Sequence, residues 1–284
     1  MRFVDFWLGF SPLSPGEPLF SRIIETFDLF VINDGVPDVL IFSVFGSLHR
    51  QACFQGVKKI FYSAESPCLQ GTPSPEWLID HDVAVLSMAK VNHPNFYRLP
   101  NIVRKDWFGT RGIYDLERFP LSLPSKSGDC VFIASNPNAL ERINFAKKLM
   151  ARMPLDCPGA GLNNIKIPGD ARMKGNISIA SRYKFFIAYE NDSVPGYCTE
   201  KIWWAFLGRS IPIYWGDPEI YDDFVEGSFV NRMDFCGDDE CLDYVEFLSR
   251  HDEEYLKVLN APKVKNYSLF SFSAPIVFLS KFIC

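Results

Sequence analysis

The segment from residue 185 to residue 216 constrains the fold of this chain more than any other. Residues 185–189 and 211–215 are apolar runs, each of a length typical of a strand buried on both faces of a parallel sheet. A helix is predicted to begin between them, near Thr199, which is a residue type that caps helix N-termini. Its first turn would contain Glu200 and Lys201, and the N–H groups of such a turn favour anions. The segment therefore predicts a βαβ unit with a candidate phosphate site.

A second strand that leads into a helix lies upstream of this unit. Residues 130–134 form an apolar run, residues 135–138 a polar turn, and residues 139–153 a series of good helix formers. Arg142 falls near the start of that helix. If the two strands run parallel, Arg142 lies at the same carboxyl edge of the sheet as Lys201. Ligands of open α/β sheets bind at this edge.

The first half of the chain shows a similar alternation. Strands are predicted at residues 1–10, 29–32, 39–45, 59–62 and 83–86. Residues 18–27 and 47–54 have the helical periodicity that is needed to cover a sheet. Pro, Ser and charged residues dominate residues 111–129, which we interpret as the connection between two domains.

Length and composition agree with this division. A chain of 284 residues with 48% hydrophobic content is long enough for two cores at roughly 150 residues per domain. We expect an α/β protein of two lobes, an N-terminal lobe at residues 1–120 and a C-terminal lobe at residues 128–262. The packing of the last segment, residues 263–284, is left open.

Composition and missing motifs argue against several classes of protein. The net charge of −5 gives no broad basic surface, so nucleic acid is not expected as a partner. The eight cysteines have neither the spacing nor the histidine partners of a zinc site, and no metal is expected. There is no P-loop and no GxGxxG motif, which disfavours kinases, ATPases and dehydrogenases. No segment reaches the roughly 18 apolar residues of a membrane span.

The polar groups of the C-terminal lobe indicate a nucleotide-diphosphate site. Arg142 and Lys201 supply two cations, and Glu200 can accept hydrogen bonds from ribose hydroxyls. Fixed cations at a helix N-terminus can neutralise a pyrophosphate leaving group without a metal. The alternative is that the polar residues of the turn at 190–200 only satisfy its backbone, and for this segment alone the two interpretations carry equal weight.

In the N-terminal lobe, Glu65 follows a predicted strand directly. A glutamate at that position points towards a cleft between lobes, where partial burial would raise its pKa to a value that suits a general base. From this lobe alone, a helix cap or a surface acid before Pro67 is the better account. Trp7 stands at the end of the first predicted strand and is a candidate for stacking on an acceptor sugar, although most tryptophans belong to the core.

Three motifs of the chain are informative when they are taken together. They are Phe61-Tyr62-Ser63-Ala64-Glu65-Ser66-Pro67, Ala134-Ser135-Asn136-Pro137-Asn138 with Arg142, and Glu190-Asn191 followed by Tyr197-Cys198-Thr199-Glu200-Lys201 and Ile211-Pro212-Ile213-Tyr214-Trp215-Gly216. This combination resembles the α-1,3-fucosyltransferases of glycosyltransferase family 10, and most closely the short bacterial members. The resemblance covers residues 59–236 well and both ends poorly.

The resemblance implies a GT-B fold, in which two Rossmann-like lobes face each other across a cleft. The donor would be GDP-fucose, held mainly by the C-terminal lobe, with no cofactor required. Arg142 and Lys201 then correspond to the pyrophosphate ligands, Glu200 to the ribose partner, and Asn191 and Tyr197 to further donor contacts. Glu65 occupies the position of the catalytic base of an inverting reaction.

Two positions depart from the family pattern. Gly196 stands where many relatives carry an acid, and Cys198 where a larger apolar residue is common. Two other functions therefore remain open. One is an inverting GT-B transferase that uses another nucleotide sugar or forms another linkage, and the other is a catalytically silent module that binds glycans or nucleotides.

The expected partners are GDP-fucose and an oligosaccharide acceptor of the β-galactoside or N-acetyllactosamine type. The linkage formed would be α-1,3, with α-1,4 as the alternative. A sequon at Asn191 would place a glycan on the donor site, which favours the cytoplasm or the cytoplasmic side of a membrane, with peripheral association. The Golgi lumen is expected only for a longer, anchored precursor.

Overall fold

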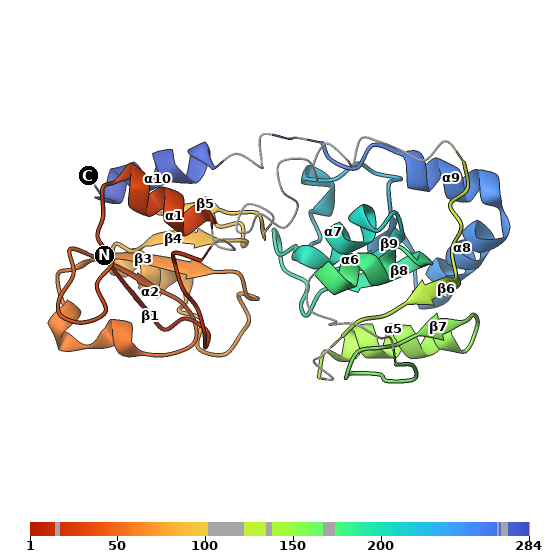
Figure 1. Cartoon of the computed structure of the whole chain (residues 1–284), viewed down its shortest axis with the longest axis horizontal. Coiled ribbons are helices and arrows are strands. Elements are labelled where there is room, and N and C mark those ends of the chain that lie inside the picture. The colour runs from red at the N-terminus through yellow and green to blue at the C-terminus, as the bar shows by residue number, and fades with distance from the viewer. Residues whose placement is uncertain are drawn as a thin grey trace. The chain divides into compact units, whose positions relative to one another are not determined.

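Two five-stranded sheets, all of whose strands run parallel, form the framework of the protein. The computed structural model describes residues 1–14, 18–101, 122–134, 138–166, 174–265, 267 and 272–283. The chain divides into two compact units (Figure 1). The first contains Met1–Trp107, Val194–Tyr197 and Tyr267–Cys284, and the second contains Phe108–Ser193 and Cys198–Asn266. Of the predicted connection between the lobes, residues 111–121 lie outside the described residues and residues 122–129 lie within the second unit.

The first unit orders its strands as in the sequence, β1-β2-β3-β4-β5. These are β1 (Arg2–Val4), β2 (Val39–Phe42), β3 (Lys58–Ser63), β4 (Ala84–Ser87) and β5 (Phe96–Arg98). The helices among its described residues are α1 (Pro18–Thr26), α2 (Pro75–Asp80) and α10 (Ser273–Ile283), with short 3-10 turns at η1 (Leu48–Arg50) and η2 (Ala52–Phe54).

Helices cover both faces of this sheet. The ring of Phe20 in α1 lies 5.0 Å from that of Tyr62, and the ring of Phe278 in α10 lies 5.5 Å from that of Tyr97. The two helices thus share one face, as Figure 1 shows. The opposite face packs against η1, η2 and α2, where Phe54 and Leu78 join the core.

Two predictions for this unit are wrong. Residues 29–32 form no strand: Phe30 is 81% exposed, and the segment runs past Met1 with hydrogen bonds at Phe30 O and Ile32 N. None of residues 29–32 is fully buried, so the segment buries less apolar surface than the central strands of the sheet do. The helix predicted at 47–54 is instead the pair of 3-10 turns η1 and η2.

The second unit has the strand order β10-β9-β8-β6-β7. Its strands are β6 (Gly128–Val131), β7 (Leu155–Asp156), β8 (Tyr183–Tyr189), β9 (Ile211–Trp215) and β10 (Val230–Asn231). Its helices are α5 (Leu140–Met150), α6 (Lys174–Ala180), α7 (Glu200–Leu207), α8 (Asp238–Arg250) and α9 (Asp252–Asn260), with 3-10 turns η3 (Ile220–Asp222) and η4 (Arg232–Asp234). The predicted β8-α7-β9 unit is confirmed.

Alternation along β8 and β9 explains the layers of this unit. Phe185, Ile187 and Tyr189 point to the core shared with α5, α8 and α9. The next residues along each strand face the side of α7, because the Tyr214 ring lies 5.9 Å from that of Phe229, which in turn lies 6.4 Å from the Phe206 ring of α7. Both faces of the sheet are buried, as the apolar runs predicted.

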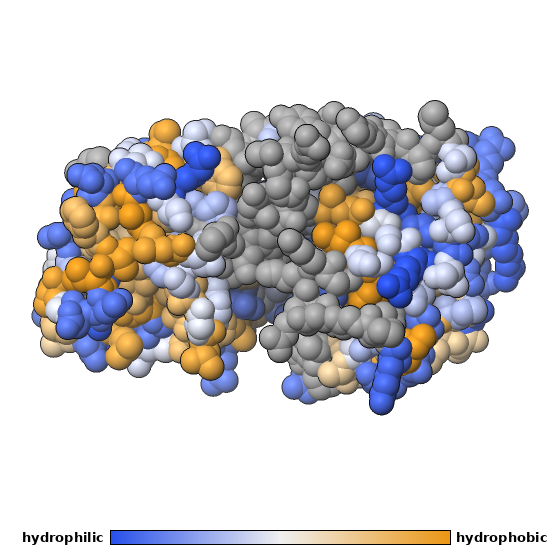
Figure 2. Space-filling view, viewed as in Figure 1, coloured by the Kyte–Doolittle hydropathy of each residue, from blue (hydrophilic) through white to orange (hydrophobic). Residues whose placement is uncertain are grey.

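Both units expose some large apolar side chains, among them Leu8 and Phe45 in the first unit and Tyr244 and Phe247 of α8 in the second. The surface around α8 and α9 is otherwise mainly hydrophilic (Figure 2), and acidic residues fill the first turn of each helix. Lys148 of α5 pairs with Asp238 of α8 at 2.6 Å, which joins these two helices at the surface. No helix within the described ranges is long and apolar enough to cross a bilayer.

Candidate active site

The candidate donor site lies at the carboxyl edge of the second sheet. Strand β8 pairs in parallel with β6 on one side, through Val131 and Phe186, and with β9 on the other. The carboxyl ends of the three strands therefore face the same edge, and β8 and β9 end side by side at Tyr189 and Trp215. The loop after β8 carries Glu190 and Asn191 and leads into α7, while Arg142 occupies the first turn of α5. The starts of α5 and α7 are expected at one edge of the sheet only if their preceding strands run parallel. Strands β6 and β8 do run parallel, so this condition is met.

Glu190 organises this edge. Its side chain is fully buried, and Oε1 accepts a hydrogen bond from the backbone N–H of Thr199 at 2.7 Å. Oε2 accepts from the Thr199 hydroxyl and from Nζ of Lys201, both at 2.7 Å. Nζ of Lys201 also donates to the Thr199 hydroxyl oxygen at 2.7 Å. One carboxylate thus fixes both the start of α7 and the ammonium group beside it.

Thr199 takes the N-cap position of α7, as predicted, but its side chain does not cap the helix. The hydroxyl donates its proton to Glu190 instead of accepting from a first-turn N–H. Sequence alone favours the capping role because Thr is a common N-cap residue, and a buried carboxylate nine positions earlier competes for the hydroxyl. The first turn of α7 is therefore left without the Thr199 side-chain cap.

The electrostatics of the site favour a cationic Lys201. Burial lowers the pKa of Lys201, but the carboxylates of Glu190 and Glu200 outweigh this effect and leave the pKa above its ordinary value. Arg142 acts in the opposite direction on the pKa of Lys201, which places the two cations within electrostatic range of each other. Arg142 is itself 4% exposed and Lys201 keeps 14% of its side chain exposed. Two cations that are largely buried at helix starts make this edge a candidate anion-binding site, as predicted from the sequence.

Gly216 allows the chain to pass closely over Glu190. A Cβ at this position would lie 2.5 Å from Cγ of Glu190 and 2.8 Å from its Cβ. The backbone N–H of Glu190 donates to the carbonyl of Trp215 at 2.8 Å, so the end of β9 and the glutamate are held together. The glycine at the end of the motif is required by this close approach.

The remaining predicted donor residues lie around this centre. Glu200 is the first residue of α7 and is half-buried, as is Asn191. Tyr197 is only 1% exposed, and it belongs with Val194–Tyr197 to the first unit. Its assignment as a donor contact stays a prediction, and its burial favours a packing role. Residues 135–137 of the second motif lie outside the described residues.

The departure from the family pattern at Gly196 has a structural reason. Gly196 has a φ of +84°, and an added Cβ would lie 2.4 Å from the carbonyl oxygen of Met88. The carbonyl of Gly196 accepts a hydrogen bond from Arg98 at 3.3 Å. In this chain the position excludes an acidic side chain by both conformation and space.

Glu65, the predicted base, lies in the first unit just beyond the carboxyl end of β3. Its backbone N–H donates to the hydroxyl of Ser63 at 3.1 Å, which fixes the turn after the strand. The side chain is half-buried. Glu65 thus stands at the strand end where the sequence predicts it.

Trp7 stands in the loop after β1, at the same carboxyl edge of the first sheet. Its ring contacts those of Phe6 and Phe10 at 5.6 and 4.8 Å, and it lines a pocket of about 410 Å³. The ring is half-buried, and its role in stacking on an acceptor sugar stays a prediction.

Two buried acids have roles that the sequence does not predict. Glu190 belongs to the polar turn and to the third motif, but neither assigns it a role, although an acid at the end of a strand buried on both faces signals a fixed charge partner. Asp5 forms a second buried pair, with the Nδ1 atom of His49 at 2.6 Å. Among the described residues no group of three or more His, Cys, Asp or Glu side chains could hold a metal ion.

The fold is similar to that of solved fucosyltransferases. A crystal structure of an α1,3-fucosyltransferase with GDP-fucose superposes with a TM-score of 0.76 at 23% identity, over 99% of this chain and 89% of that one. A second structure of an α1,3-fucosyltransferase gives a TM-score of 0.77 with the same coverage. The two parallel sheets therefore form the GT-B fold, which confirms the expected fold class.

Sequence comparison identifies the family. The profile of the C-terminal part of glycosyltransferase family 10 (fucosyltransferase) matches residues 123–273. The chain thus belongs to glycosyltransferase family 10, as the resemblance of the motifs predicted.

Curated relatives agree with this assignment. The alpha-(1,3)-fucosyltransferase FucT of Helicobacter pylori is 40% identical over 136 residues, which are 48% of this chain and 28% of that protein. The GDP-fucose protein O-fucosyltransferase 3 of Gallus gallus is 30% identical over 142 residues, 47% of this chain and 30% of that protein. The matches thus span less than a third of these relatives.

Proposed function

We propose that this protein is an inverting fucosyltransferase that moves L-fucose from GDP-β-L-fucose to a hydroxyl of an N-acetyllactosamine-type glycan. The linkage proposed is α-1,3, with α-1,4 as the alternative. The observation that carries the proposal is the pair of buried cations, Arg142 and Lys201, at two helix starts of the unit that matches family 10. The names of the H. pylori relative and of the superposed crystal structures support the choice of sugar and linkage.

The proposed donor site works by charge neutralisation. As the bond between C1 of fucose and the β-phosphate oxygen breaks, negative charge develops on GDP. Lys201, held by Glu190, and Arg142 in α5 stabilise that charge, together with the first-turn N–H groups of α7. Because these groups are fixed before the reaction, no reorganisation is needed when the charge appears.

The acceptor half of the reaction is assigned to the first unit. The acceptor hydroxyl oxygen attacks C1 from the face opposite GDP, its proton passes to the Glu65 carboxylate, and GDP departs. One C–O bond forms and one breaks, and the configuration changes from the β-linked donor to an α-linked product. General base catalysis of this kind contributes about 10²- to 10⁴-fold to the rate.

Transfer of fucose to a protein hydroxyl is a second candidate function. The Gallus gallus relative, named a GDP-fucose protein O-fucosyltransferase, matches a similar share of this chain as the H. pylori relative. The same donor site would serve both reactions, because the difference lies in the acceptor. The acceptor therefore has to be identified by experiment.

An acceptor panel with GDP-fucose tests the proposal. The panel should contain N-acetyllactosamine, its type 1 isomer, lactose and a folded protein rich in Ser and Thr. We expect a product from N-acetyllactosamine with fucose linked α-1,3 to the N-acetylglucosamine residue, identified by linkage analysis. Product from the folded protein alone would support the second candidate, and no product from any acceptor would refute both.

A further inference from the structure

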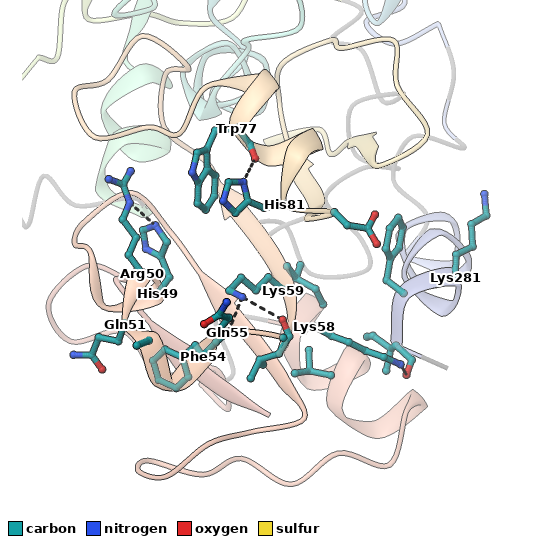
Figure 3. A pocket seen from close by; sticks show the side chains of 18 residues that line it. His49, Arg50, Gln51, Phe54, Gln55, Lys58, Lys59, Trp77, His81 and Lys281 are labelled. Atoms are coloured by element: carbon teal, nitrogen blue, oxygen red, sulfur yellow. Dashed lines mark hydrogen bonds between the residues drawn. The ribbon is translucent and has the colours of Figure 1, made fainter.

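A groove in the first unit lies at the amino ends of its strands, away from the edge that carries Glu65. It has a volume of about 820 Å³ and is lined by Val39 and Lys58, which begin β2 and β3 (Figure 3). Residues of the η1 and η2 turns, the end of α2 and the end of α10 complete its wall. Because β3 is six residues long, Lys58 and the Glu65 turn are separated by about 20 Å. The groove is therefore distinct from the candidate active site.

Positive charge dominates the groove. The lining residues with a cationic side chain are Arg50, Lys58, Lys59 and Lys281. The acid among the described lining residues, Asp82, accepts a hydrogen bond from the amide of Asn95 at 2.9 Å. The lining also contains the side-chain amides of Gln51 and Gln55, which can bond neutral hydroxyls. A volume of this size is typical of a small-molecule site.

Arg50 is held in place by aromatic rings. Its guanidinium carbon lies 5.7 Å from the centre of the Trp77 ring, and the His81 ring stacks on Trp77 at 4.2 Å. Nε of Arg50 donates to Nε2 of His49 at 3.3 Å. Since a guanidinium can only donate, Nε2 of His49 accepts and its Nδ1–H points to Asp5. Among the described residues the terminal nitrogens of Arg50 have no hydrogen-bond partner, so they remain for a ligand.

Two of the three lysines that line the groove donate to backbone carbonyls, and the third is exposed. Nζ of Lys59 donates to the carbonyl of Phe54 at 2.7 Å, and burial lowers its pKa. Nζ of Lys58 donates to the carbonyl of Ile283 at 3.1 Å and so fastens the end of α10. Lys281 is exposed at the opposite rim. Arg50 and Lys281 thus stand on two sides of the groove, as Figure 3 shows.

We propose that this groove binds an anionic saccharide, a glycan chain that carries carboxylate or phosphate groups. Arg50 would form a bidentate pair with one acidic group and Lys281 would attract another, while Gln51 and Gln55 bond the hydroxyls between them. The choice of a saccharide rests on the proposed function, and the site would then hold a remote part of the acceptor chain. The negative charge of the saccharide can come from carboxylate groups or from phosphate groups, and the groove would bind either kind of anionic sugar.

Direct binding to the full chain, without GDP-fucose, tests this inference. The probes are tetragalacturonate, a phosphorylated oligosaccharide, a neutral N-acetyllactosamine oligomer of similar length, and inorganic phosphate, each titrated by calorimetry. We expect saturable binding of at least one anionic saccharide, weakened by salt, with the neutral oligomer and inorganic phosphate binding at least 10-fold more weakly. Equal binding of the neutral oligomer or of phosphate would overturn the proposal, as would no binding at all.

A matched pair of double variants locates the site. Arg50→Gln with Lys281→Gln should weaken binding of the anionic saccharide by about 10- to 100-fold, because both charge-assisted contacts are lost and each of them stands at an exposed position where solvent weakens it. Lys147→Gln with Arg182→Gln removes the same charge from exposed positions of the second unit and should leave the affinity unchanged. Equal weakening by both variants would show a non-specific charge effect and reject the groove.

The two proposals fail separately. Transfer of fucose to a short neutral acceptor should be the same in the groove variant and in the unchanged chain, because neither residue belongs to the donor or base machinery. Binding of the anionic saccharide by a chain that transfers no fucose would refute the proposed function and support the groove. Fucose transfer by a chain that does not bind the anionic saccharide would support the proposed function and refute the groove.

Discussion

Glu190 holds Lys201 at 2.7 Å inside the second unit, and the same carboxylate binds both the N–H and the hydroxyl of Thr199. Three donors on one buried carboxylate determine where the ammonium group stands and how α7 begins. The relationship links the end of β8 to the first turn of the next helix. In the proposed reaction it prepares a cation for the GDP leaving group.

Replacing Glu190 with Gln should destabilise the protein and weaken GDP binding together. The change leaves the Lys201 ammonium without its carboxylate in a largely buried site, and breaking a buried pair costs about 3–5 kcal/mol. Because Lys201 is 14% exposed, we expect a loss near the lower end of this range in denaturant unfolding. Glu226→Gln, a change at a surface acid of the same unit, is the control and should be neutral. Unaltered stability in Glu190→Gln would contradict the role of this pair.

Lys201→Gln and Arg142→Gln should each weaken GDP binding by about 10- to 100-fold, since a hydrogen bond to a charged group contributes about 1.5–3 kcal/mol. Calorimetric titration of GDP measures this effect. Lys148→Gln, which removes a cation from the far end of α5, provides the comparison and should bind GDP normally. Equal affinity in all three variants would exclude the two cations from the donor site.

Glu65→Gln should lower kcat by about 10²- to 10⁴-fold and leave the affinity for GDP unchanged, because the carboxylate accepts a proton and does not touch the nucleotide. Steady-state kinetics and GDP titration on the same preparation separate the two quantities. Glu25→Gln alters an exposed acid of α1 and serves as the control. A Glu65→Gln enzyme with normal kcat removes Glu65 from the mechanism.

Gly216→Ala should destabilise the second unit by about 1–3 kcal/mol, because the new methyl group would overlap Cγ of Glu190 at 2.5 Å. The control is Gly237→Ala. That glycine has an extended φ of −163° and no atom within 4 Å of the position of an added Cβ. Thermal unfolding of both variants measures the difference, and equal melting temperatures would be evidence against the tight packing over Glu190.

The buried Lys263 should make the free energy of unfolding depend on pH. Burial lowers its pKa from 10.5 to about 7, although Nζ donates to the carbonyl of Val258 at 2.9 Å. Between these two values the unfolded chain binds more protons than the folded one, so stability rises with pH, by up to about 1.4 kcal/mol per pH unit. We expect the free energy of unfolding, relative to Lys263→Met, to increase from pH 7 to pH 9. A constant difference across this range would refute the lowered pKa.

The sequence predicts the sheets better than their edges. The apolar runs at β8 and β9 are buried on both faces, and this pattern is strong enough to identify the βαβ unit. The run at residues 29–32 is as apolar, but it lies at the margin of the first sheet, where tertiary packing decides whether a strand forms. The hydrophobicity of a segment indicates that it tends to be buried, but it does not show whether a strand is available for the segment to pair with.

The site shows a similar division. Arg142 and Lys201 could be predicted because helix starts at a common sheet edge follow from parallel topology. The hydrogen bonds between Glu190 and Thr199 could not be predicted, because they depend on how the eight-residue loop between these residues folds back to the end of β8. The same holds for Tyr197, whose 1% exposure comes from the packing of residues 194–197 with the first unit.

The central claim is that this chain transfers fucose from GDP-fucose, and acceptor-dependent release of GDP tests it most directly. Purified protein should be incubated with N-acetyllactosamine and, in parallel, with GDP-fucose, GDP-mannose or UDP-galactose. We predict nucleotide release from GDP-fucose that requires the acceptor and falls at least 100-fold in Glu65→Gln. Release from another donor in preference to GDP-fucose, or none from GDP-fucose with any acceptor, would contradict the claim.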